Sequence, residues 1–123
     1  MPPRITIIDD RTDVLSVFCS LLQQAGFTVT PVEHRGEMPG DLLKKVMQTS
    51  PDVILLDGNL AADVKGADLV PALKLALSHA RVYGFSTADS MKEEFLQAGA
   101  DGFVLKDIYS PAATVQELTK LLL

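Results

Sequence analysis

The chain has 123 residues, of which 47% are hydrophobic and 22% are charged, and this composition is typical of one globular domain with its own core. The formal net charge of −5 excludes a basic nucleic-acid-binding surface, because no stripe of Lys and Arg is available to neutralise phosphates. A single cysteine, Cys19, rules out an internal disulfide, and no segment has the pattern of a signal peptide or a membrane span. We therefore expect a single domain over residues 1–123 in a reducing compartment, the cytoplasm.

The first half of the chain predicts two strands that alternate with two helices. A continuous apolar run over residues 5–9 indicates a buried parallel strand, and Gly26 ends the helix that follows it. The core-facing residues of that helix are Leu15, Phe18, Leu22 and Ala25. Residues 27–33 indicate an edge strand, because Pro31 interrupts the run. A second helix is predicted to begin at Asp41, with an inner face made of Leu42, Leu43, Val46 and Met47.

The second half continues the same alternation after a break at residues 50–52. Its predicted strands are residues 53–56, 81–86 and 102–106. A long loop over residues 58–66 leads into a helix that carries Leu69, Leu73, Ala76 and Leu77. The remaining predicted helices cover residues 88–98 and a segment that begins at Pro111. Strands joined by short helical crossovers pair in parallel with right-handed connections, so the predicted fold class is α/β with a doubly wound five-stranded parallel sheet.

Charged residues stand directly after three of the predicted strands. Asp9 and Asp10 close the first strand, Asp57 follows the third, and Lys106 closes the fifth. The carboxyl ends of parallel strands share one edge of the sheet, which is where ligands bind in open α/β folds. We therefore expect these four residues to lie close together. Three carboxylates and one ammonium group predict a cation site that contains a nucleophile.

Each acidic residue also has an ordinary structural alternative. Asp9 and Asp10 could cap the following helix, which is a frequent use of Asp. Thr12 or Asp13 already serve that purpose, so a metal site explains the acid pair better. Asp57 could be a turn residue, but a turn residue would not require matching acids and a lysine at neighbouring strand ends.

Three further residues with reactive side chains are expected to be structural. His34 and His79 have no partners at metal-ligand spacing, so both are predicted to be solvated loop residues. Cys19 is predicted to be a packed thiol of the first helix.

Four ordered segments of the chain resemble one known family. They are Ile7-Ile8-Asp9-Asp10, the segment 51–57 that ends in Asp57, Phe85-Ser86-Thr87-Ala88, and the segment 98–106 that ends in Lys106. Together they make the chain similar, from end to end, to the receiver domains of two-component response regulators. The resemblance implies a flavodoxin-like fold with strand order 2-1-3-4-5 and five helices.

The same resemblance implies a role for each residue of the cation site. Asp57 would accept a phosphoryl group from a histidine kinase or a histidine phosphotransfer protein. Mg2+ would be held directly by Asp10 and Asp57, through water by Asp9, and by the backbone carbonyl of Asn59. Lys106 would pair with Asp57 before phosphorylation and with phosphoryl oxygens afterwards. No enzymatic activity is implied beyond this self-catalysed transfer and a slow autodephosphorylation.

A switch is implied as well. Ser86 would donate its hydroxyl to a phosphoryl oxygen, although Thr87 beside it could supply the hydroxyl instead. Phe103 occupies the position of an aromatic residue that swings inward after phosphorylation, and a plain core phenylalanine explains it equally well. The signal would reach a downstream protein target through the face formed by helix four, strand five and helix five.

The chain departs from the family pattern in three places. The loop 58–66 lacks the usual proline after Leu60 and is one residue longer, and the segment 86–99 is about two residues shorter. Asp107 follows Lys106 where many relatives have a proline after a cis peptide bond. We predict that the Lys106–Asp107 bond is cis despite its cost of roughly 2.5–4 kcal/mol, and that the lysine nitrogen approaches Asp57.

Two other classes of protein remain as alternatives. A phosphorylation-independent interaction module with this fold typically loses one of the acids or the lysine. A haloacid-dehalogenase-like phosphatase needs a second acid two residues after the nucleophile, where this chain has Asn59, and room for a cap. The sequence ends at Leu123 with no output domain, so we expect a stand-alone or an excised receiver. It would be a monomer or a phosphorylation-dependent homodimer, without nucleic acid or membrane as a partner.

Overall fold

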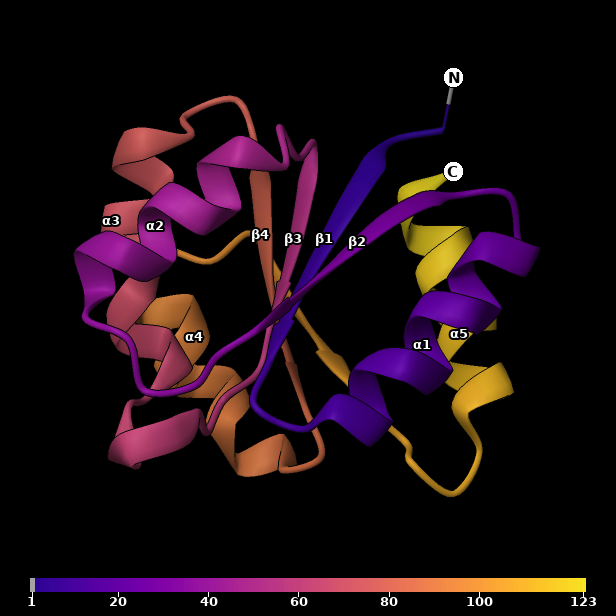
Figure 1. The fold of residues 1–123 in the computed structure, drawn as a ribbon. Coiled ribbons are helices and arrows are strands. Elements are labelled where there is room, and N and C mark those ends of the chain that lie inside the picture. Colours follow the sequence, from indigo (N-terminus) through magenta and orange to yellow (C-terminus); the bar gives the residue numbers. More distant parts are fainter. Residues whose placement is uncertain (1) are drawn as a thin grey trace.

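The computed structural model describes residues 2–123, and the strands of these residues form one parallel sheet. The strands are β1 (Arg4–Asp9), β2 (Thr28–Glu33), β3 (Val53–Leu56), β4 (Arg81–Ser86) and β5 (Gly102–Leu105). Their order across the five-stranded sheet is β2-β1-β3-β4-β5 (Figure 1). The predicted fold class and strand order are confirmed, and β2 with its Pro31 lies at an edge, as expected.

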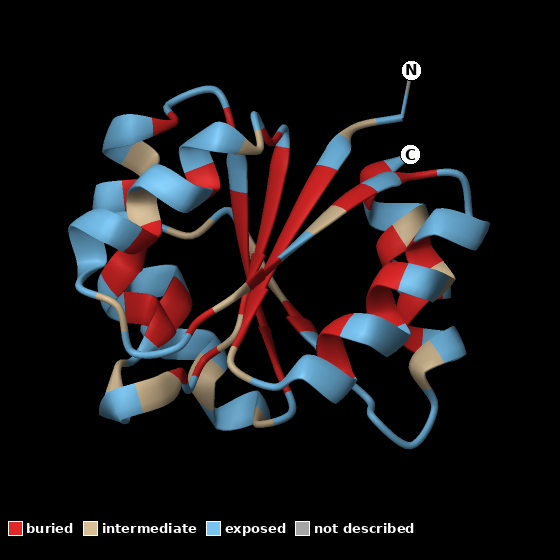
Figure 2. Cartoon of the chain, viewed as in Figure 1, coloured by how far each residue is buried: buried red, intermediate tan, exposed pale blue. Residues whose placement is uncertain are grey.

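Helices cover both faces of the sheet (Figure 1). One face carries α1 (Thr12–Gln24) and α5 (Pro111–Leu122), and the other carries α2 (Pro39–Gln48), α3 (Val70–Ala76) and α4 (Lys92–Gln97). Figure 2 shows the central strands buried along their length, whereas the helices are buried mainly on the side that faces the sheet. A sheet covered on both faces needs apolar residues at every strand position, which explains the continuous apolar runs of β1 and β3. Within residues 2–123, no helix is both long enough and apolar enough to cross a membrane.

The start of α1 differs from the prediction. Arg11 occupies the N-cap position and no side chain caps the helix there, so neither Thr12 nor Asp13 has the expected capping role. Asp13 forms an ion pair with Arg11 at 3.0 Å, and the hydroxyl of Thr12 donates to Glu33 of β2. The first turn of α1 is therefore held to its surroundings by side-chain pairs instead of a cap.

Two helix boundaries were also predicted imprecisely. α2 begins at Pro39, before the expected Asp41, because the fixed φ of proline suits the first turn of a helix. Its buried face is narrower than expected, since Met47 is 46% exposed. The predicted helix 88–98 is replaced by a 3-10 turn over Asp89–Met91 and the short α4.

The short α4 is anchored by one aromatic side chain. Phe95 is fully buried and packs against Phe103 of β5, with ring centroids 6.0 Å apart. Gly84 of β4 lies directly beneath both rings. A Cβ atom at this position would lie 2.5 Å from the Phe95 ring and 2.8 Å from Phe103. The lack of a side chain at Gly84 is therefore what allows α4 to pack so closely on the sheet.

We expect Gly84→Ala to lower the free energy of unfolding by about 1–3 kcal/mol, because the added methyl group overpacks the interface between α4 and the sheet. Gly40→Ala is the matched control, since Gly40 lies in α2 and a methyl group added there would meet nothing within 4 Å. That variant should leave the free energy unchanged or raise it by up to about 1 kcal/mol. Urea unfolding measures both, and equal effects of the two substitutions would contradict the packing argument.

Candidate functional site

The carboxyl ends of four strands meet at one edge of the sheet. In the strand register Ile8 pairs with Leu56, Leu56 pairs with Gly84, and Ser86 pairs with Leu105. The residues at and just after these ends therefore lie side by side. Those that line one depression of about 250 Å³ include Asp9, Asp10, Asp57, Asn59, Ser86, Thr87 and Lys106. Of the residues that the sequence predicts for the site, only Phe103 does not line this depression.

A buried lysine joins the acids. Lys106 Nζ donates to Asp9 Oδ2 at 2.6 Å and to Asp57 Oδ1 at 3.2 Å. The lysine side chain is 4% exposed and that of Asp9 is 1% exposed. The ammonium also lies 5.2 Å from the ring centroid of Phe85, which belongs to the intervening strand β4. The predicted approach of the lysine nitrogen to Asp57 is confirmed, but its closer partner is Asp9, for which no such pairing was predicted.

The predicted cis bond is wrong, because the peptide bond between Lys106 and Asp107 is trans. The backbone N–H of Lys106 donates to the carbonyl of Ser86 at 2.8 Å, so the hydrogen-bond ladder of β5 continues to the lysine itself. The next N–H, that of Asp107, donates to Thr114 Oγ1 at 3.0 Å. Regular strand geometry up to Lys106 already carries the side chain to the edge where Asp57 lies.

Three carboxylates form the acidic part of the site. Asp9, Asp10 and Asp57 each offer one oxygen, and these oxygens lie within 4.8 Å of one another. Three carboxylates and the one ammonium of Lys106 leave a formal charge of −2, which a divalent cation would neutralise. Hard oxygen donors in a depression open to water are the ligands that Mg2+ prefers. The donor set therefore fits Mg2+.

Asp9 and Asp10 differ in how freely they could bind a cation. Both oxygens of Asp9 have partners, because Oδ1 accepts from the N–H of Arg11 at 3.0 Å and Oδ2 accepts from Lys106. Asp10 is partly exposed, whereas Asp9 is buried. A cation could thus reach Asp10 directly and Asp9 more easily through a water molecule.

The environment of Asp57 changes its acidity. Burial raises the pKa of Asp57 to about 6, the charge of Lys106 opposes this shift, and repulsion from Asp9 adds to it. A further positive charge close to Asp57 would therefore stabilise its ionised form.

We expect the contribution of Asp57 to the free energy of unfolding, in protein stripped of divalent cations, to fall as pH rises from about 4 to about 6. The raised pKa means that the folded state binds the proton of Asp57 more tightly than the unfolded state, so stability is lost as the proton leaves. Asp57→Asn should remove this pH dependence and increase stability at pH 7 by about 1–3 kcal/mol. Urea unfolding of the wild-type and Asp57→Asn proteins between pH 4.5 and 7.5, with chelator present, measures this difference. An identical pH dependence of the free energy of unfolding in both proteins would contradict the raised pKa of Asp57.

The hydroxyl of Ser86 is held by the segment that leads into α4. Ser86 Oγ accepts from the N–H of Ala88 at 3.2 Å and donates to Met91 Sδ at 3.4 Å. Ser86 is buried and Thr87 is exposed, although both line the depression. Met91 Sδ also lies against Gly58, where a Cβ atom would be only 2.1 Å from the sulfur. No pattern in the sequence pointed to Met91, because a methionine at the start of a helix is ordinarily a core filler.

Phe103 packs against the core that lies between the sheet and the helices α2, α3 and α4. It is half-buried and packs on Phe95 with a tilt of 41° between the rings. It therefore lies on the α4 side of the sheet. In the strand register Phe103 pairs with Gly84, two residues before Ser86.

The loop after Asp57 forms a small hairpin. Asn59 and Lys65 form an antiparallel bridge, and Ala62 (φ 59°) and Asp63 (φ 58°) make the turn between them. Two successive residues with positive φ are the mark of a type I′ turn, which normally uses Asn and Gly. Left-handed backbone costs other residues roughly 1–2 kcal/mol each, so this turn is strained and needs support from its surroundings.

His34 provides a contact with this hairpin, and its predicted place in a solvated loop is wrong. The residue is 2% exposed, and its Nδ1 accepts from the N–H of Ala61 at 3.1 Å. One signal in the sequence could have found it, because His34 directly follows β2 and so reaches the same edge of the sheet as Asp9. His79 is exposed, as predicted.

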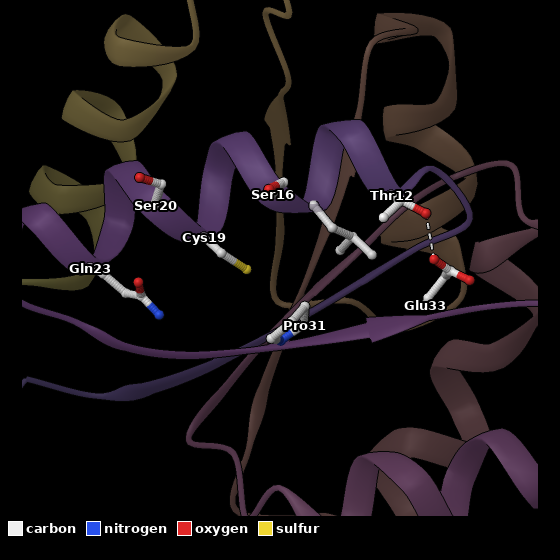
Figure 3. A pocket seen from close by; sticks show the side chains of 8 residues that line it. Thr12, Ser16, Cys19, Ser20, Gln23, Pro31 and Glu33 are labelled. Atoms are coloured by element: carbon white, nitrogen blue, oxygen red, sulfur yellow. Dashed lines mark hydrogen bonds between the residues drawn. The ribbon is translucent and has the colours of Figure 1, made fainter.

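A second hollow, of about 460 Å³, lies between α1 and β2 (Figure 3). Hydroxyl and amide side chains line it, and Cys19 points into it from α1 (Figure 3). Burial raises the pKa of the Cys19 thiol to about 11, so the thiol stays protonated at neutral pH and is a poor nucleophile. The prediction of a packed thiol is confirmed, and the chemistry of the molecule is concentrated at the acidic depression.

An acidic cluster with a buried lysine, at the carboxyl edge of a 2-1-3-4-5 parallel sheet, defines a class of signalling domain. The chain belongs to the response regulator receiver domain family, whose sequence pattern matches residues 5–119. Members of this family are the phosphorylatable domains of two-component signal transduction, in which Mg2+ binds at the acidic pocket.

The chain matches only part of the length of its individual relatives. The chain is 31% identical over 106 residues to the transcriptional regulatory protein PrrA of Mycobacterium leprae, which is 85% of this chain and 43% of that protein. It is 32% identical over 77 residues to the nitrate/nitrite response regulator protein homolog of Haemophilus influenzae, which is 61% of this chain and 36% of that protein. The chain thus spans less than half the length of these relatives.

Solved structures share the fold. The chemotaxis response regulator CheY4 of Vibrio cholerae superposes with a TM-score of 0.80 at 21% identity, over 100% of both chains. The response regulator TrrA of Thermotoga maritima, solved in complex with Mg(2+)-BeF, gives a TM-score of 0.77 at 20% identity over 98% of each chain. At these identities the likeness shows a common fold.

Proposed function

We propose that this chain is a phosphorylation-dependent signalling switch that accepts a phosphoryl group on Asp57 with the help of Mg2+. The donor would be a phosphohistidine of a histidine kinase or of a histidine phosphotransfer protein. The observation that carries the proposal is the convergence of Asp57 with two further carboxylates and a buried ammonium in one depression.

The transfer follows from the position of Asp57. One carboxylate oxygen attacks phosphorus, the P–N bond of the phosphohistidine breaks, and the imidazole nitrogen keeps the bonding electron pair. A carboxylate is a weak nucleophile and the phosphoryl group is anionic, so positioning and neutralisation of charge supply most of the acceleration. Lys106 Nζ lies 3.2 Å from Asp57 Oδ1, which supports a role in which it would pair with a phosphoryl oxygen once Asp57 has reacted.

The metal would be held by Asp10 and Asp57 directly, by Asp9 through water, and by the backbone carbonyl of Asn59. Both Asp9 oxygens already have hydrogen-bond partners, which supports the indirect role for that residue. When bound, Mg2+ would supply the positive charge that offsets the approach of an anionic group to three carboxylates.

The switch would act through Ser86. To donate to a phosphoryl oxygen on Asp57, its hydroxyl must give up the hydrogen bond that it donates to Met91, and this would loosen the 3-10 turn that precedes α4. Phe103 lies next to α4 and could then change its packing on Phe95. The elements α4, β5 and α5 each carry an exposed leucine, namely Leu96, Leu105 and Leu121, which supports this face as the docking surface for a downstream protein target or a second copy of the chain.

The proposed setting is the cytoplasm, in keeping with the single buried thiol, and the proposed unit is one receiver domain over residues 1–123. A phosphorylation-independent module is the weaker alternative, because the three acids and the lysine are brought together in one site.

We expect Asp57→Asn to abolish the phosphate mass increment that acetyl phosphate and Mg2+ produce in the intact protein. Asp63→Asn is the matched control, because Asp63 lies exposed in the same loop, and this variant should still gain one phosphate. Mass spectrometry of the intact protein, together with its circular dichroism, checks both. A stable phosphate on the Asp57→Asn protein would sink the assignment of the acceptor.

We expect Mg2+ to raise the melting temperature, with a gain of about 2.7 kcal/mol when free Mg2+ is a hundred times its dissociation constant. Asp10→Ala should remove most of this gain and should stabilise the metal-free protein, since it relieves repulsion among the carboxylates. Asp13→Ala is the control, because Asp13 is exposed and pairs with Arg11 outside the cluster. Equal Mg2+ responses of the wild-type and Asp10→Ala proteins would show that Asp10 is not a ligand.

A further inference from the structure

A buried histidine ties the loop after Asp57 to the rest of the sheet edge. His34 directly follows β2, and its backbone N–H donates to the carbonyl of Asp9 at 2.8 Å. Its side chain reaches the other way, where Nδ1 accepts from the N–H of Ala61 at 3.1 Å. One residue thus links the end of β1 to the hairpin over residues 59–65, although these segments are far apart in sequence.

The ring of His34 has a fixed orientation. Because Nδ1 accepts a hydrogen bond, this nitrogen is unprotonated and the ring proton is on Nε2, which lies 3.7 Å from Glu37 Oε2. Glu37 is itself held by Lys45 Nζ at 2.6 Å and by the N–H of Arg35 at 3.1 Å. The hydrogen bond from Lys45 is the main reason that the pKa of Glu37 is lowered to about 2, so its carboxylate remains ionised. The ionised Glu37 beside Nε2 therefore helps to keep Nδ1 of His34 directed at the N–H of Ala61.

The hairpin combines its own hydrogen bonds with one from outside. Within it, the N–H of Leu60 donates to the carbonyl of Val64 at 2.8 Å. The N–H of Val64 donates to the carbonyl of Ala61 at 3.3 Å. The N–H of Ala61 has no part in this closure and is satisfied by His34 instead. The turn is strained at Ala62 and Asp63, so a fixed partner at Ala61 restricts where the hairpin can lie.

The position of this hairpin matters for the metal site. Asn59 lies at its base, two residues before Ala61, and lines the acidic depression. Mg2+ demands nearly ideal octahedral geometry, so a small displacement of one oxygen ligand weakens binding. Groups that orient ligands without touching the metal commonly change metal affinity by roughly 10- to 100-fold when they are removed.

We propose that His34 is a positioning residue of the receiver site: through Nδ1 it fixes the amide of Ala61, and thereby holds the Asn59 carbonyl where Mg2+ would bind. This inference rests on the proposed function, because it presupposes the metal site. It assigns no chemical step to His34, which contacts neither the acceptor carboxylate nor the lysine in the described hydrogen bonds.

Three substitutions of His34 separate the effect of its hydrogen bond from the effect of its side-chain volume. His34→Asn places an amide oxygen close to the position of Nδ1, so it can still accept from Ala61. His34→Gln places its polar atoms nearer to Nε2, and His34→Leu has none. The second histidine offers a matched control, because His79 is exposed and His79→Leu removes an imidazole far from this hairpin's hydrogen bonds.

The test compares Mg2+ dissociation constants from isothermal titration calorimetry with amide hydrogen exchange of metal-free protein. We expect His34→Leu and His34→Gln to weaken Mg2+ binding about tenfold and to speed exchange at the Ala61 amide. His34→Asn should restore both to within about threefold of wild type, and His79→Leu should change neither. A general loss of stability would lower the melting temperature of all three His34 variants without this rescue by Asn.

Three outcomes would overturn the inference, and they are distinguishable. Wild-type affinity for Mg2+ in a folded His34→Leu protein would show that His34 does not position the site. Rapid exchange of the Ala61 amide in the wild-type protein would show that its hydrogen bond is not maintained in solution. Absence of Mg2+ binding by the wild-type protein would instead refute the proposed metal site, and this inference with it.

Discussion

The structure of the site depends on one buried ammonium group. Lys106 comes from the end of β5, yet its two carboxylate partners come from β1 and β3, on the far side of β4. Burying these charges is costly unless they are paired closely, so the pairing fixes how the strand ends are arranged. One lysine cannot balance three acids, and the remaining negative charge makes the depression a place for a further cation. Burial is the main cause of the raised pKa of Asp57, and repulsion from Asp9 and Asp10 adds to it against the charge of Lys106.

Around this pairing, the backbone hydrogen bonds of the sheet extend past the strands themselves. The N–H of Asp57 donates to Ile8, that of His34 to Asp9, and that of Lys106 to Ser86. The backbone at these residues is therefore still held by the hydrogen bonds of the sheet, and the loops begin after them. Loops supply the chemistry, but the sheet decides where each loop starts, as is usual for sites built on rigid scaffolds.

Two loops at the edge of the depression make contacts that the family resemblance does not include. Before α4, Met91 lies against Ser86 and Gly58, and the Ser86 hydroxyl donates to its thioether. After Asp57, a strained hairpin is held by a buried histidine. Packing and hydrogen bonds from these two side chains therefore surround the charged centre.

Those features of the protein that follow from local sequence pattern could be predicted before the structure was known. The continuous apolar run at Val53–Leu56, bounded by a break at residues 50–52, predicts a strand buried on both faces, with the charge of Asp57 at its end. The same reasoning places Asp9, Asp10 and Lys106 at one edge, and it predicted the strand order through the family resemblance. Helix boundaries were less certain, because the short α4 depends on how Phe95 fits over Gly84.

Which charges pair and which polar groups are buried became apparent in the folded structure alone. Lys106 lies closer to Asp9, 97 residues away in the sequence, than to Asp57, and its peptide bond is trans because the β5 ladder already aims it correctly. His34 looked like a loop residue, yet an amide 27 residues away makes it a buried acceptor. Local patterns reflect periodic burial along one segment, whereas these contacts depend on the distances between segments, which only the folded chain sets.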